Sequence, residues 1–351
     1  MLNLWRKAKA MKTRLLGMTP AEMKALAQGA GLPAFTGGQL AQWVYGKRVR
    51  SLDAMTNISL SGRERLSKIC EVGIDEPLGR VESADGTRKY LFPVRENPAE
   101  AVEAVMIPDQ DRRTLCVSSQ AGCKMGCRFC MTGRQGFHGN LSAADILSQF
   151  HAVDESACLT NAVFMGMGEP LDNWEAVRRA IEVLTAPWGW GWSPKRITLS
   201  TIGVVPVLQR FLEESRCHLA VSLHNPFPEE RLQLMPVQKA WPLEDVVALL
   251  RRYDFSGQRR VSFEYTLFAG WNDTPRHAEG LLRLLRGLEC RVNLIRFHRI
   301  PDFPYAPSAE TVMEDFRDRL CRGGITATIR ASRGEDILAA CGLLAGQHKQ
   351  L

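Results

Sequence analysis

The second half of the chain alternates short apolar segments with amphipathic ones, and this alternation limits it to few folds. Segments with helical periodicity begin near Trp174, Val204, Leu243, Pro275 and Ala309. Strands that are apolar along their whole length are buried on both faces, which indicates a parallel sheet covered by helices. This alternation predicts an α/β fold, a partial parallel (β/α) barrel. The strand segments are 161–167, 196–201, 218–223, 260–268, 291–297 and 325–331.

Polar signatures directly follow the first three of these strands. The motif GMGEP, residues 166–170, follows the first strand and contains Gly168 and Glu169. Ser200 lies at the end of the second strand, and Ser222, Leu223 and His224 end the third. Because active sites of barrels lie at the carboxyl ends of the strands, these residues are expected to share one site.

The first fifth of the chain is basic and helical. Residues 1–70 contain 12 Lys and Arg against 3 Asp and Glu, so the net charge of +7 originates there. A helix is expected from Thr19, with Pro20 at its first position, and further helices near 39–48 and 62–70. Such a charge attracts polyanions, of which nucleic acid is the commonest, although a solvated basic face is an equal alternative.

Three domains are expected. Residues 1–75 form a small basic helical domain, and 76–112 form a linking β-hairpin region whose turn is Asp85-Gly86. Residues 113–351 form the catalytic domain, which begins with further strand segments and a helix over 141–157 opened by Ser142. Strands are also expected in 101–108 and 114–119.

The composition excludes several classes of protein. With 45 % apolar and 24 % charged residues, the 351-residue chain is neither disordered nor fibrous. It has no uncharged apolar stretch of about 18 residues and no secretory signal, so we expect a cytoplasmic protein without membrane contact. Ten cysteines in such a chain indicate metal or redox chemistry for any clustered subset.

The sharpest motif is CKMGCRFC, which spaces Cys123, Cys127 and Cys130 as C-x3-C-x2-C. Thiolates suit iron–sulfur clusters or zinc. Three ligands for a four-iron cluster leave one iron open, which can bind S-adenosylmethionine (SAM). The alternative is a zinc site with Cys116 or His138 as fourth ligand, although zinc sites favour paired C-x2-C motifs. The spacing, with Phe129 before the last cysteine, resembles the radical SAM superfamily.

Further motifs make the resemblance narrower. Nearly the whole chain, from about residue 15 to 346, is similar to the RlmN/Cfr group of radical SAM RNA methyltransferases. The matching segments are LLGMTPAE, PAFTGGQ, MTNIS, CVSSQAGC, the cysteine motif, QGFHGNL, FMGMGEP, STIGVVP, SLHNP, LMP and DILAACG. The resemblance implies one 4Fe–4S cluster, two SAM molecules per turnover, and a flavodoxin-type electron donor. It also implies 23S rRNA and tRNA as substrates.

The resemblance assigns roles residue by residue. Cys341 is methylated by the first SAM molecule. A 5′-deoxyadenosyl radical, formed from the second, removes a hydrogen atom from that methyl group. Cys116 releases the product by forming a disulfide with Cys341, and Glu103 accepts a proton. SAM contacts are implied for Gly168, Glu169, Ser200, Ser222, Leu223, His224 and His298, the last standing where the family usually has asparagine.

The resemblance further implies that the product is adenosine methylated at C2 and that the basic N-terminal domain helps to hold RNA. Contacts to RNA are expected from Trp43, Tyr45, Lys47, Arg48 and Arg50, whereas the tryptophans of PWGWGW, residues 187–192, are expected to be packed. Three alternatives remain open: Cfr-like methylation at C8, which gives ribosomal antibiotic resistance, a radical SAM enzyme with another substrate, and a non-enzymatic RNA-binding or zinc-stabilised protein.

Overall fold

The computed structural model describes residues 12–257 and 259–346. The described residues divide into two compact units. The N-terminal unit comprises the residues up to Ile74 together with Arg179–Trp192, and the sheet unit comprises Asp75–Arg178 and the residues from Ser193 onward. The first eleven residues, part of the basic region in the sequence, lie outside the described residues.

The N-terminal unit is helical, as expected. Thr19 caps the first helix through a capping box with Glu22, whose carboxylate accepts from the Thr19 N–H at 2.6 Å. The second helical region begins earlier than expected and changes to a π-helix. The elements are β1 (Thr13–Arg14), α1 (Pro20–Gly29), α2 (Thr36–Ala41), the π-helix η1 (Gln42–Gly46), η2 (Leu52–Ala54), α3 (Leu60–Ile69) and β2 (Cys70–Glu71).

The aromatic residues of this unit pack inside it. Trp43 and Tyr45 are buried, and the Tyr45 hydroxyl donates to the carbonyl of Met18 at 2.7 Å. The expectation that these two rings contact RNA is therefore wrong, because their faces are covered. The Trp188 ring lies 5.5 Å from that of Tyr45, and Arg48 stacks 3.7 Å above Trp190. The expected packing of the tryptophan segment is confirmed.

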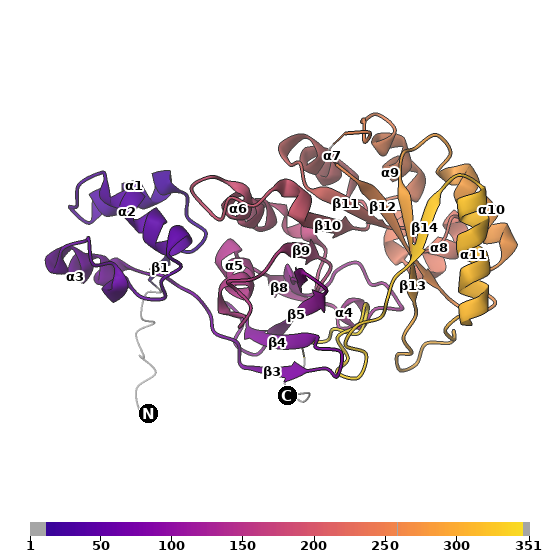
Figure 1. The fold of residues 1–351 in the computed structure, drawn as a ribbon, viewed down its shortest axis with the longest axis horizontal. Helices are drawn as coiled ribbons and strands as arrows, with labels where there is room; N and C mark the ends of the chain where they lie inside the picture. The colour runs from indigo at the N-terminus through magenta and orange to yellow at the C-terminus, as the bar shows by residue number, and fades with distance from the viewer. Residues whose placement is uncertain (1–11, 258, 347–351) are drawn as a thin grey trace, which may run out of the picture. The chain divides into compact units, whose positions relative to one another are not determined.

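The sheet unit is built on one ten-stranded sheet. Its neighbouring strands run parallel from β6 to β14, in the order 6-9-10-11-12-13-14. The sheet curves without closing, which confirms the expected partial barrel (Figure 1). The parallel strands are β6 (Arg112–Cys116), β9 (Asn161–Phe164), β10 (Ile197–Thr201), β11 (His218–Ser222), β12 (Val261–Leu267), β13 (Arg291–Arg296) and β14 (Thr326–Ile329).

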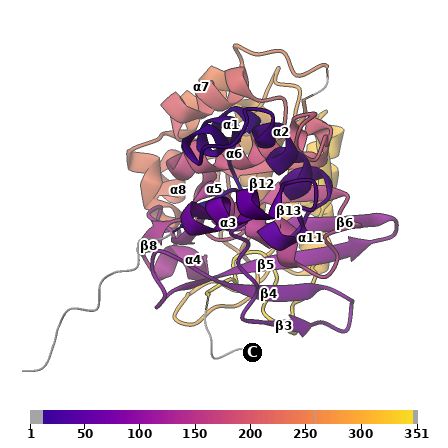
Figure 2. The same cartoon turned by 90° about the vertical axis from the view of Figure 1, so that its left-hand side faces the viewer.

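Three antiparallel strands extend this sheet beyond β6. They are β3 (Gly79–Glu82), β4 (Arg88–Pro93) and β5 (Ala101–Asp109), and the expected Asp85-Gly86 turn joins the first two. Figure 2 shows β6, β5, β4 and β3 following one another at the edge of the sheet. Residues 76–112 are thus a continuous part of the sheet.

The register of these strands places three polar side chains on one face. Lys89 and Cys116 both stand opposite Val105, and Glu103 lies two residues from Val105 on the same strand. Since residues directly opposite share a face and alternate residues do too, Lys89, Glu103 and Cys116 face the same side of the sheet.

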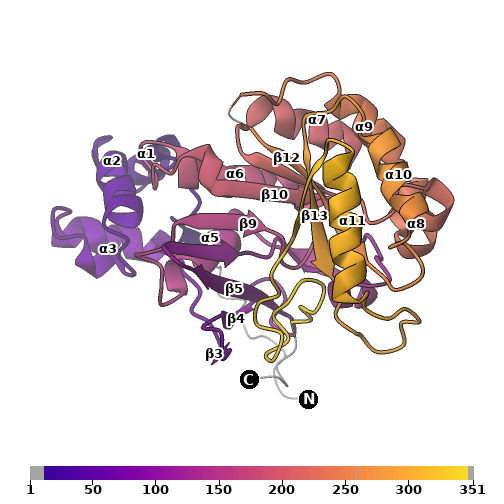
Figure 3. The same ribbon diagram turned by 45° about the vertical axis from the view of Figure 1, so that its right-hand side comes forward.

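Helices α9, α10 and α11 cover the outer face of the parallel strands (Figure 3). The helix opened by Ser142 ends at Ala152, before the expected position, and α8 was not expected from the sequence. No helix in the described part of the chain has both the length and the apolar character needed to cross a membrane. The helices are α4 (Met131–Arg134), α5 (Ala143–Ala152), α6 (Trp174–Thr185), α7 (Val205–Glu214), α8 (Pro228–Leu234), α9 (Leu243–Leu250), α10 (Pro275–Leu284) and α11 (Glu310–Arg322).

Candidate functional site

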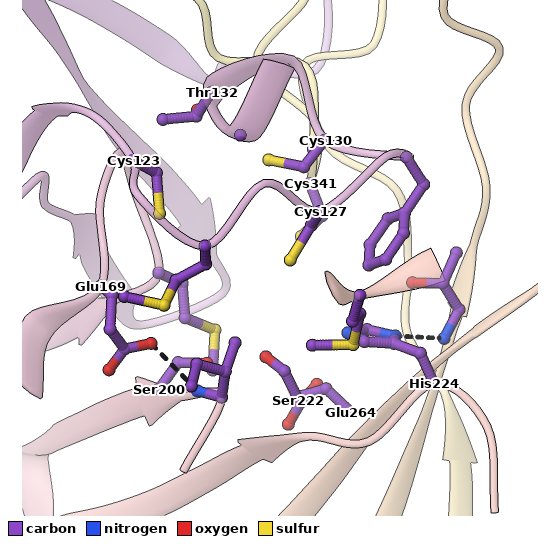
Figure 4. A pocket seen from close by; sticks show the side chains of 18 of the residues that line it. Cys123, Cys127, Cys130, Thr132, Glu169, Ser200, Ser222, His224, Glu264 and Cys341 are labelled. Atoms are coloured by element: carbon purple, nitrogen blue, oxygen red, sulfur yellow. Dashed lines mark hydrogen bonds between the residues drawn. The ribbon is translucent and has the colours of Figure 1, made fainter. Parts of the chain in front are cut away.

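A cavity at the carboxyl ends of the parallel strands, the first cavity, gathers most of the expected site residues. The three cysteines of the CKMGCRFC motif line one side of it, and Figure 4 shows their sulfur atoms directed toward the same space. Ser200, Ser222 and Glu264 line the opposite side, with Glu169 and His224 at its two ends. Gly168 and Cys341 also line it. The first cavity therefore joins the cysteine motif to the polar strand ends.

Close backbone contacts fix the loop that carries the three cysteines. It leaves β7 (Gln120–Gly122), which pairs with β8 (Phe137–Asn140), and the N–H of Cys123 donates to the carbonyl of Gly136 at 2.7 Å. A Cβ on Gly133 would lie 2.9 Å from the backbone of Cys127, so only glycine lets α4 fold against the loop. The three thiols are thus held around one space.

These thiols fit an iron–sulfur cluster better than a zinc ion. No three metal-ligating side chains of the described residues surround a single ion-sized point. Neither expected fourth zinc ligand lines the first cavity: Cys116 lies elsewhere, and the exposed His138 faces Glu100 at 3.3 Å. The zinc alternative is not supported, because a closed zinc site needs four ligands within about 2.3 Å of one ion. Three soft thiols on one side of an open space suit a larger cluster.

Burial disfavours the thiolate forms of Cys123 and Cys127 in the absence of a metal. It raises the pKa of Cys123 to about 12 and the pKa of Cys127 well above 9, and neighbouring thiols of the motif raise both further. Because metal ligands must lose their protons, cluster assembly would release protons from this loop.

Glycines let the GMGEP segment approach the cysteine region. A Cβ on Gly166 would meet the Val117 carbonyl at 2.6 Å, and one on Gly168, with a φ of +99°, would meet the Gln120 backbone N at 2.8 Å. Both positions therefore require glycine. Gln120 in turn accepts a hydrogen bond from the Glu169 N–H at 2.9 Å, which fixes the next residue.

The Glu169 carboxylate is buried and engaged by the loop after β10. It accepts from the Thr201 hydroxyl at 2.6 Å and from the Ile202 N–H at 2.9 Å. Burial raises the pKa of Glu169 to about 7, although these hydrogen bonds oppose the rise. The carboxylate thus lies at the cavity wall, positioned by the adjacent strand end.

The β11 segment contributes Ser222 and His224 to the first cavity. His224 has a φ of +57°, and its Nδ1 accepts from the Thr266 N–H at 3.0 Å. Burial, aided by Arg231, lowers the pKa of His224 to about 3, so the ring is neutral. Leu223 is fully buried and does not line the cavity, but its carbonyl accepts from Arg231 at 3.0 Å.

A second cavity adjoins the first and contains Cys116. Cys341 and Arg330 line both cavities, whereas Cys116 lines the second only. Burial raises the pKa of Cys116 to about 12, and the neighbouring Cys341 thiol raises it further. The two expected catalytic cysteines are therefore brought together, and Cys341 stands on the wall between the cavities.

Two site residues were missed at the sequence level. Glu264 is buried in β12 and accepts from Asn293 at 2.8 Å, and Arg330 lies 3.3 Å from its carboxylate. Nearby negative charges, first that of Glu264, raise the pKa of Arg330 although burial lowers it. A lone carboxylate within the apolar segment VSFEYTLF was the available signal for Glu264.

Glu103 and His298 lie apart from the expected SAM contacts. Glu103 lines neither cavity and pairs with Lys89 at 3.0 Å, both side chains being buried. His298 lines the second cavity, where its Nε2 lies 2.7 Å from the Ser332 hydroxyl. The structure does not bring His298 together with Glu169, Ser200 and His224 in the first cavity.

Comparisons with known proteins agree with this arrangement. The profile of the Radical SAM superfamily matches residues 117–284, which contain the cysteine motif and the polar ends of three strands. The profile of the ribosomal RNA large subunit methyltransferase N-terminal domain matches residues 13–72. A crystal structure of a radical SAM methyltransferase from Sphaerobacter thermophilus superposes with a TM-score of 0.90 at 38 % identity, covering 95 % of this chain and all of that one.

The fold and the cavity thus define a radical SAM enzyme, a class that uses a 4Fe–4S cluster and SAM. A probable dual-specificity RNA methyltransferase RlmN from Porphyromonas gingivalis is 59 % identical over 94 % of this chain and 96 % of its own length. The dual-specificity RNA methyltransferase RlmN from Syntrophus aciditrophicus is 41 % identical over 94 % and 95 %. The chain belongs to the RlmN family of RNA methyltransferases.

Proposed function

We propose that the protein methylates C2 of adenosine in 23S rRNA, at the peptidyl-transferase centre, and in tRNA next to the anticodon. The observation that carries the proposal is the position of Cys341 on the wall between the two cavities. A residue in this position can receive a methyl group from a ligand in the first cavity. It can then deliver carbon to a base in the second.

The chemistry at C2 explains why a cysteine has to carry the methyl group. C2 of adenine is an electron-poor carbon without an acidic proton or a lone pair, so it cannot attack the sulfonium of SAM directly. The Cys341 sulfur is a far better nucleophile and takes the methyl group from a first SAM. When bound, the cluster and a second SAM supply a 5′-deoxyadenosyl radical that can remove a hydrogen atom from that methyl group.

The remaining steps use the two cysteines and Glu103. The carbon on Cys341 bonds to C2 of the adenine, and Glu103 accepts the proton that C2 loses. Cys116 then loses its proton and attacks the Cys341 sulfur, so that an S–S bond forms while the bond between sulfur and the new carbon breaks. That carbon takes up a proton and becomes the methyl group, and the unpaired electron of the adduct passes to the electron-transfer partner. The placement of Cys116 beside Cys341 in the second cavity supports this release step.

The second cavity has the charge expected for an RNA site. Arg112, Arg296, Arg330 and Arg333 line it together with the two cysteines. Arginine pairs well with phosphate oxygens, and phosphate contacts help to offset the cost of extracting a base from its stack. In the N-terminal unit, exposed Lys47 and Arg50 are the residues that remain suited to holding RNA phosphates.

Three associated features belong to this proposal. The reaction consumes two SAM molecules per turnover, and a flavodoxin-type protein delivers electrons to the cluster. The reaction takes place in the cytoplasm, where the RNA substrates are made. The polar lining of the first cavity, with Gly168, Glu169, Ser200, Ser222 and His224, is the proposed SAM site. Leu223 does not line it but joins Ser222 to His224, and its carbonyl accepts from Arg231.

Nucleoside analysis by mass spectrometry tests the proposal. Anaerobically reconstituted protein is incubated with SAM, a reductant and unmodified 23S rRNA fragment or tRNA, and 2-methyladenosine is expected from both RNAs. Cys341→Ala and Cys116→Ala should yield no released product, whereas Cys321→Ala, which changes an exposed cysteine outside both cavities, should retain full activity.

The other outcomes decide between the alternatives. Formation of 8-methyladenosine would assign the Cfr-like reaction instead. Retained activity in Cys341→Ala, or absence of methylated adenosine with an intact cluster, would overturn the proposal and require a different substrate for this radical SAM site.

A further inference from the structure

The Glu103 carboxylate holds the chain segment that carries Cys341. Its Oε2 accepts from the backbone N–H of Ala345 at 2.7 Å and from that of Gly346 at 3.2 Å. Its Oε1 faces the Lys89 ammonium at 3.0 Å, and both side chains are almost fully buried. In this arrangement both oxygens of Glu103 are engaged, one by the segment and one by Lys89.

The same segment, residues 341–346, is held on its other side by α4, the short helix that follows the cysteine motif. We call this segment the catalytic tail. The Met131 N–H donates to the Gly342 carbonyl at 2.8 Å, and the Thr132 hydroxyl donates to the Leu344 carbonyl at 2.7 Å. The tail thus lies between α4, which follows the last cysteine of the motif, and Glu103 of β5. Glu103 holds the two amides at the end of the tail, where Gln135, directly after α4, also donates to the Ala345 carbonyl.

We propose that Glu103 is a positioning residue for Cys341, and that Lys89 holds Glu103 in that role. The inference rests on the proposed function, because it concerns the cysteine that carries the methyl group. It adds a second task to Glu103 and assigns a task to Lys89. With the tail docked on Glu103, Cys341 lines both cavities and is thus within reach of the first cavity, where the methyl group is supplied.

Lys89 is needed because the carboxylate is buried. A buried charge without a partner is strongly destabilising, and removing one member of a buried pair is more harmful than replacing both. The strand register places Lys89 opposite Val105, two residues from Glu103, so the ammonium meets the carboxylate on the same face of the sheet. Lys89 thereby pairs with one carboxylate oxygen of Glu103 and leaves the other directed at the tail amides.

The arrangement sets the order of two steps, methyl transfer to Cys341 and proton removal from C2. While the tail is docked, the Cys341 thiol loses its proton to solvent and its sulfur bonds to the methyl carbon of SAM. The bond from that carbon to the sulfonium breaks, and S-adenosylhomocysteine leaves. Glu103 can accept the proton of C2 only after the tail amides release its oxygen. Docking thus serves methyl transfer to Cys341, and undocking serves proton removal from the RNA.

A matched pair of double variants separates anchoring from proton transfer. Lys89→Met with Glu103→Gln removes both charges but keeps an oxygen that can accept from the tail amides. Lys89→Met with Glu103→Leu removes the acceptor as well. Both pairs avoid an unpaired buried charge, so both should fold. Cluster absorbance and amide protection of the β4–β5 ladder serve as folding controls.

Two measurements on the full chain report whether the catalytic tail is docked on Glu103. Hydrogen exchange should show the Ala345 and Gly346 amides protected in the wild type and in the glutamine pair, and exchanging about tenfold faster or more in the leucine pair. Methylation of Cys341 is followed by intact-protein mass with SAM and no reductant, on chain synthesised without SAM. It should persist in the glutamine pair and slow by about tenfold or more in the leucine pair.

The outcomes separate this inference from the proposed function. Wild-type tail protection and Cys341 methylation in the leucine pair would overturn the anchoring role. Equal loss in both pairs, with folding controls intact, would overturn it too, because the acceptor oxygen would then not be what matters. If wild-type Cys341 is never methylated, the proposed function fails, while hydrogen exchange still tests the anchor.

Discussion

Asp85 accepts a hydrogen bond from the loop that carries Asp336, and Asp336 accepts hydrogen bonds from the loop that carries Asp85. Asp336, shortly before Cys341, accepts from the Ser83 hydroxyl at 2.5 Å and from the Ala84 N–H at 3.2 Å. Asp85, in the turn between β3 and β4, accepts from the Gly334 N–H at 3.0 Å. The hairpin at the edge of the sheet is therefore tied to the segment that leads into the catalytic tail.

This relationship predicts an unusually acidic Asp85. Burial raises its pKa, but hydrogen bonds, from Thr87 first and also from Gly334, lower the pKa of Asp85 to about 2. Since this is below the unfolded value of about 3.9, the contribution to stability is complete above that value and is lost as the pH falls toward 2. The Gly334 amide resonance should therefore titrate in NMR with a midpoint near 2.

Asp85→Asn should abolish that titration, whereas Asp336→Asn, which leaves the bond to Gly334 in place, should keep it. A midpoint at about 3.9, the ordinary value for aspartate, would show that the hydrogen bonds from Thr87 and Gly334 to Asp85 are not formed in solution.

Glu230 should stabilise the fold in a pH-dependent way. Its carboxylate accepts from Asn225 at 2.9 Å and lies 2.7 Å from His277 Nε2. Burial raises its pKa, but these groups and Arg276 lower the pKa of Glu230 to about 2, so its contribution holds above about pH 4 and is lost as the pH falls. Glu230→Gln should lower the free energy of unfolding by about 1–2 kcal/mol at pH 7.

Urea denaturation at pH 7, 4 and 3 measures this difference, which should shrink at the lowest pH. Glu279→Gln is the matched control, because that carboxylate is exposed and lies 3.9 Å from Arg283; its effect should stay below about 0.5 kcal/mol. An equal loss in both variants at pH 7 would contradict the role given to Glu230.

Periodicity made the parallel half of the fold predictable. Each of the strands expected from residue 161 onward is present, because fully buried strands require continuous apolar runs that few other structures tolerate. Helix ends were less predictable. The helix opened by Ser142 stops at Ala152 although helix-compatible residues continue, and α8, with seven residues, is too short for periodicity to reveal.

Site residues that belong to a sequence motif were predictable. Those brought together by strand register were not. The spacing of the three clustered cysteines predicts a cluster site, and the glycines of GMGEP predict a close approach of the backbone to a ligand. The partnership of Lys89 with Glu103 depends on which residues stand opposite in β4 and β5, and that register is decided by tertiary packing. Docking of residues 345 and 346 on Glu103 joins positions far apart in the chain.

Gly168→Ala should damage both the fold and SAM binding. The added Cβ would meet the Gln120 backbone N at 2.8 Å, and the φ of +99° is unfavourable for alanine. We expect a loss of about 2 kcal/mol or more in the free energy of unfolding and SAM affinity at least about tenfold weaker. Gly38→Ala, inside α2 where a Cβ meets nothing within 4 Å, is the control; it should leave SAM affinity unchanged and should not lower the free energy of unfolding. Unchanged SAM affinity in Gly168→Ala would remove this segment from the SAM site.

His298→Asn tests whether the residue at this position contacts SAM, as the family resemblance implies. The histidine lines the second cavity, with Nε2 2.7 Å from the Ser332 hydroxyl and Nδ1 3.2 Å from the Glu335 carboxylate. Because His298 lies on the side of Cys341 where we propose that RNA binds, we expect the Kd for SAM, measured by calorimetry on the reconstituted enzyme, to change by less than about twofold.

The KM for RNA should instead rise, because the wall of the second cavity loses a fixed side chain. Ser332→Ala removes the same hydrogen bond from its other end and should raise the KM for RNA similarly while leaving SAM affinity unchanged. A Kd for SAM about tenfold weaker in His298→Asn alone would place His298 in the SAM site and would require residues 298 and 169 to approach one another when SAM binds.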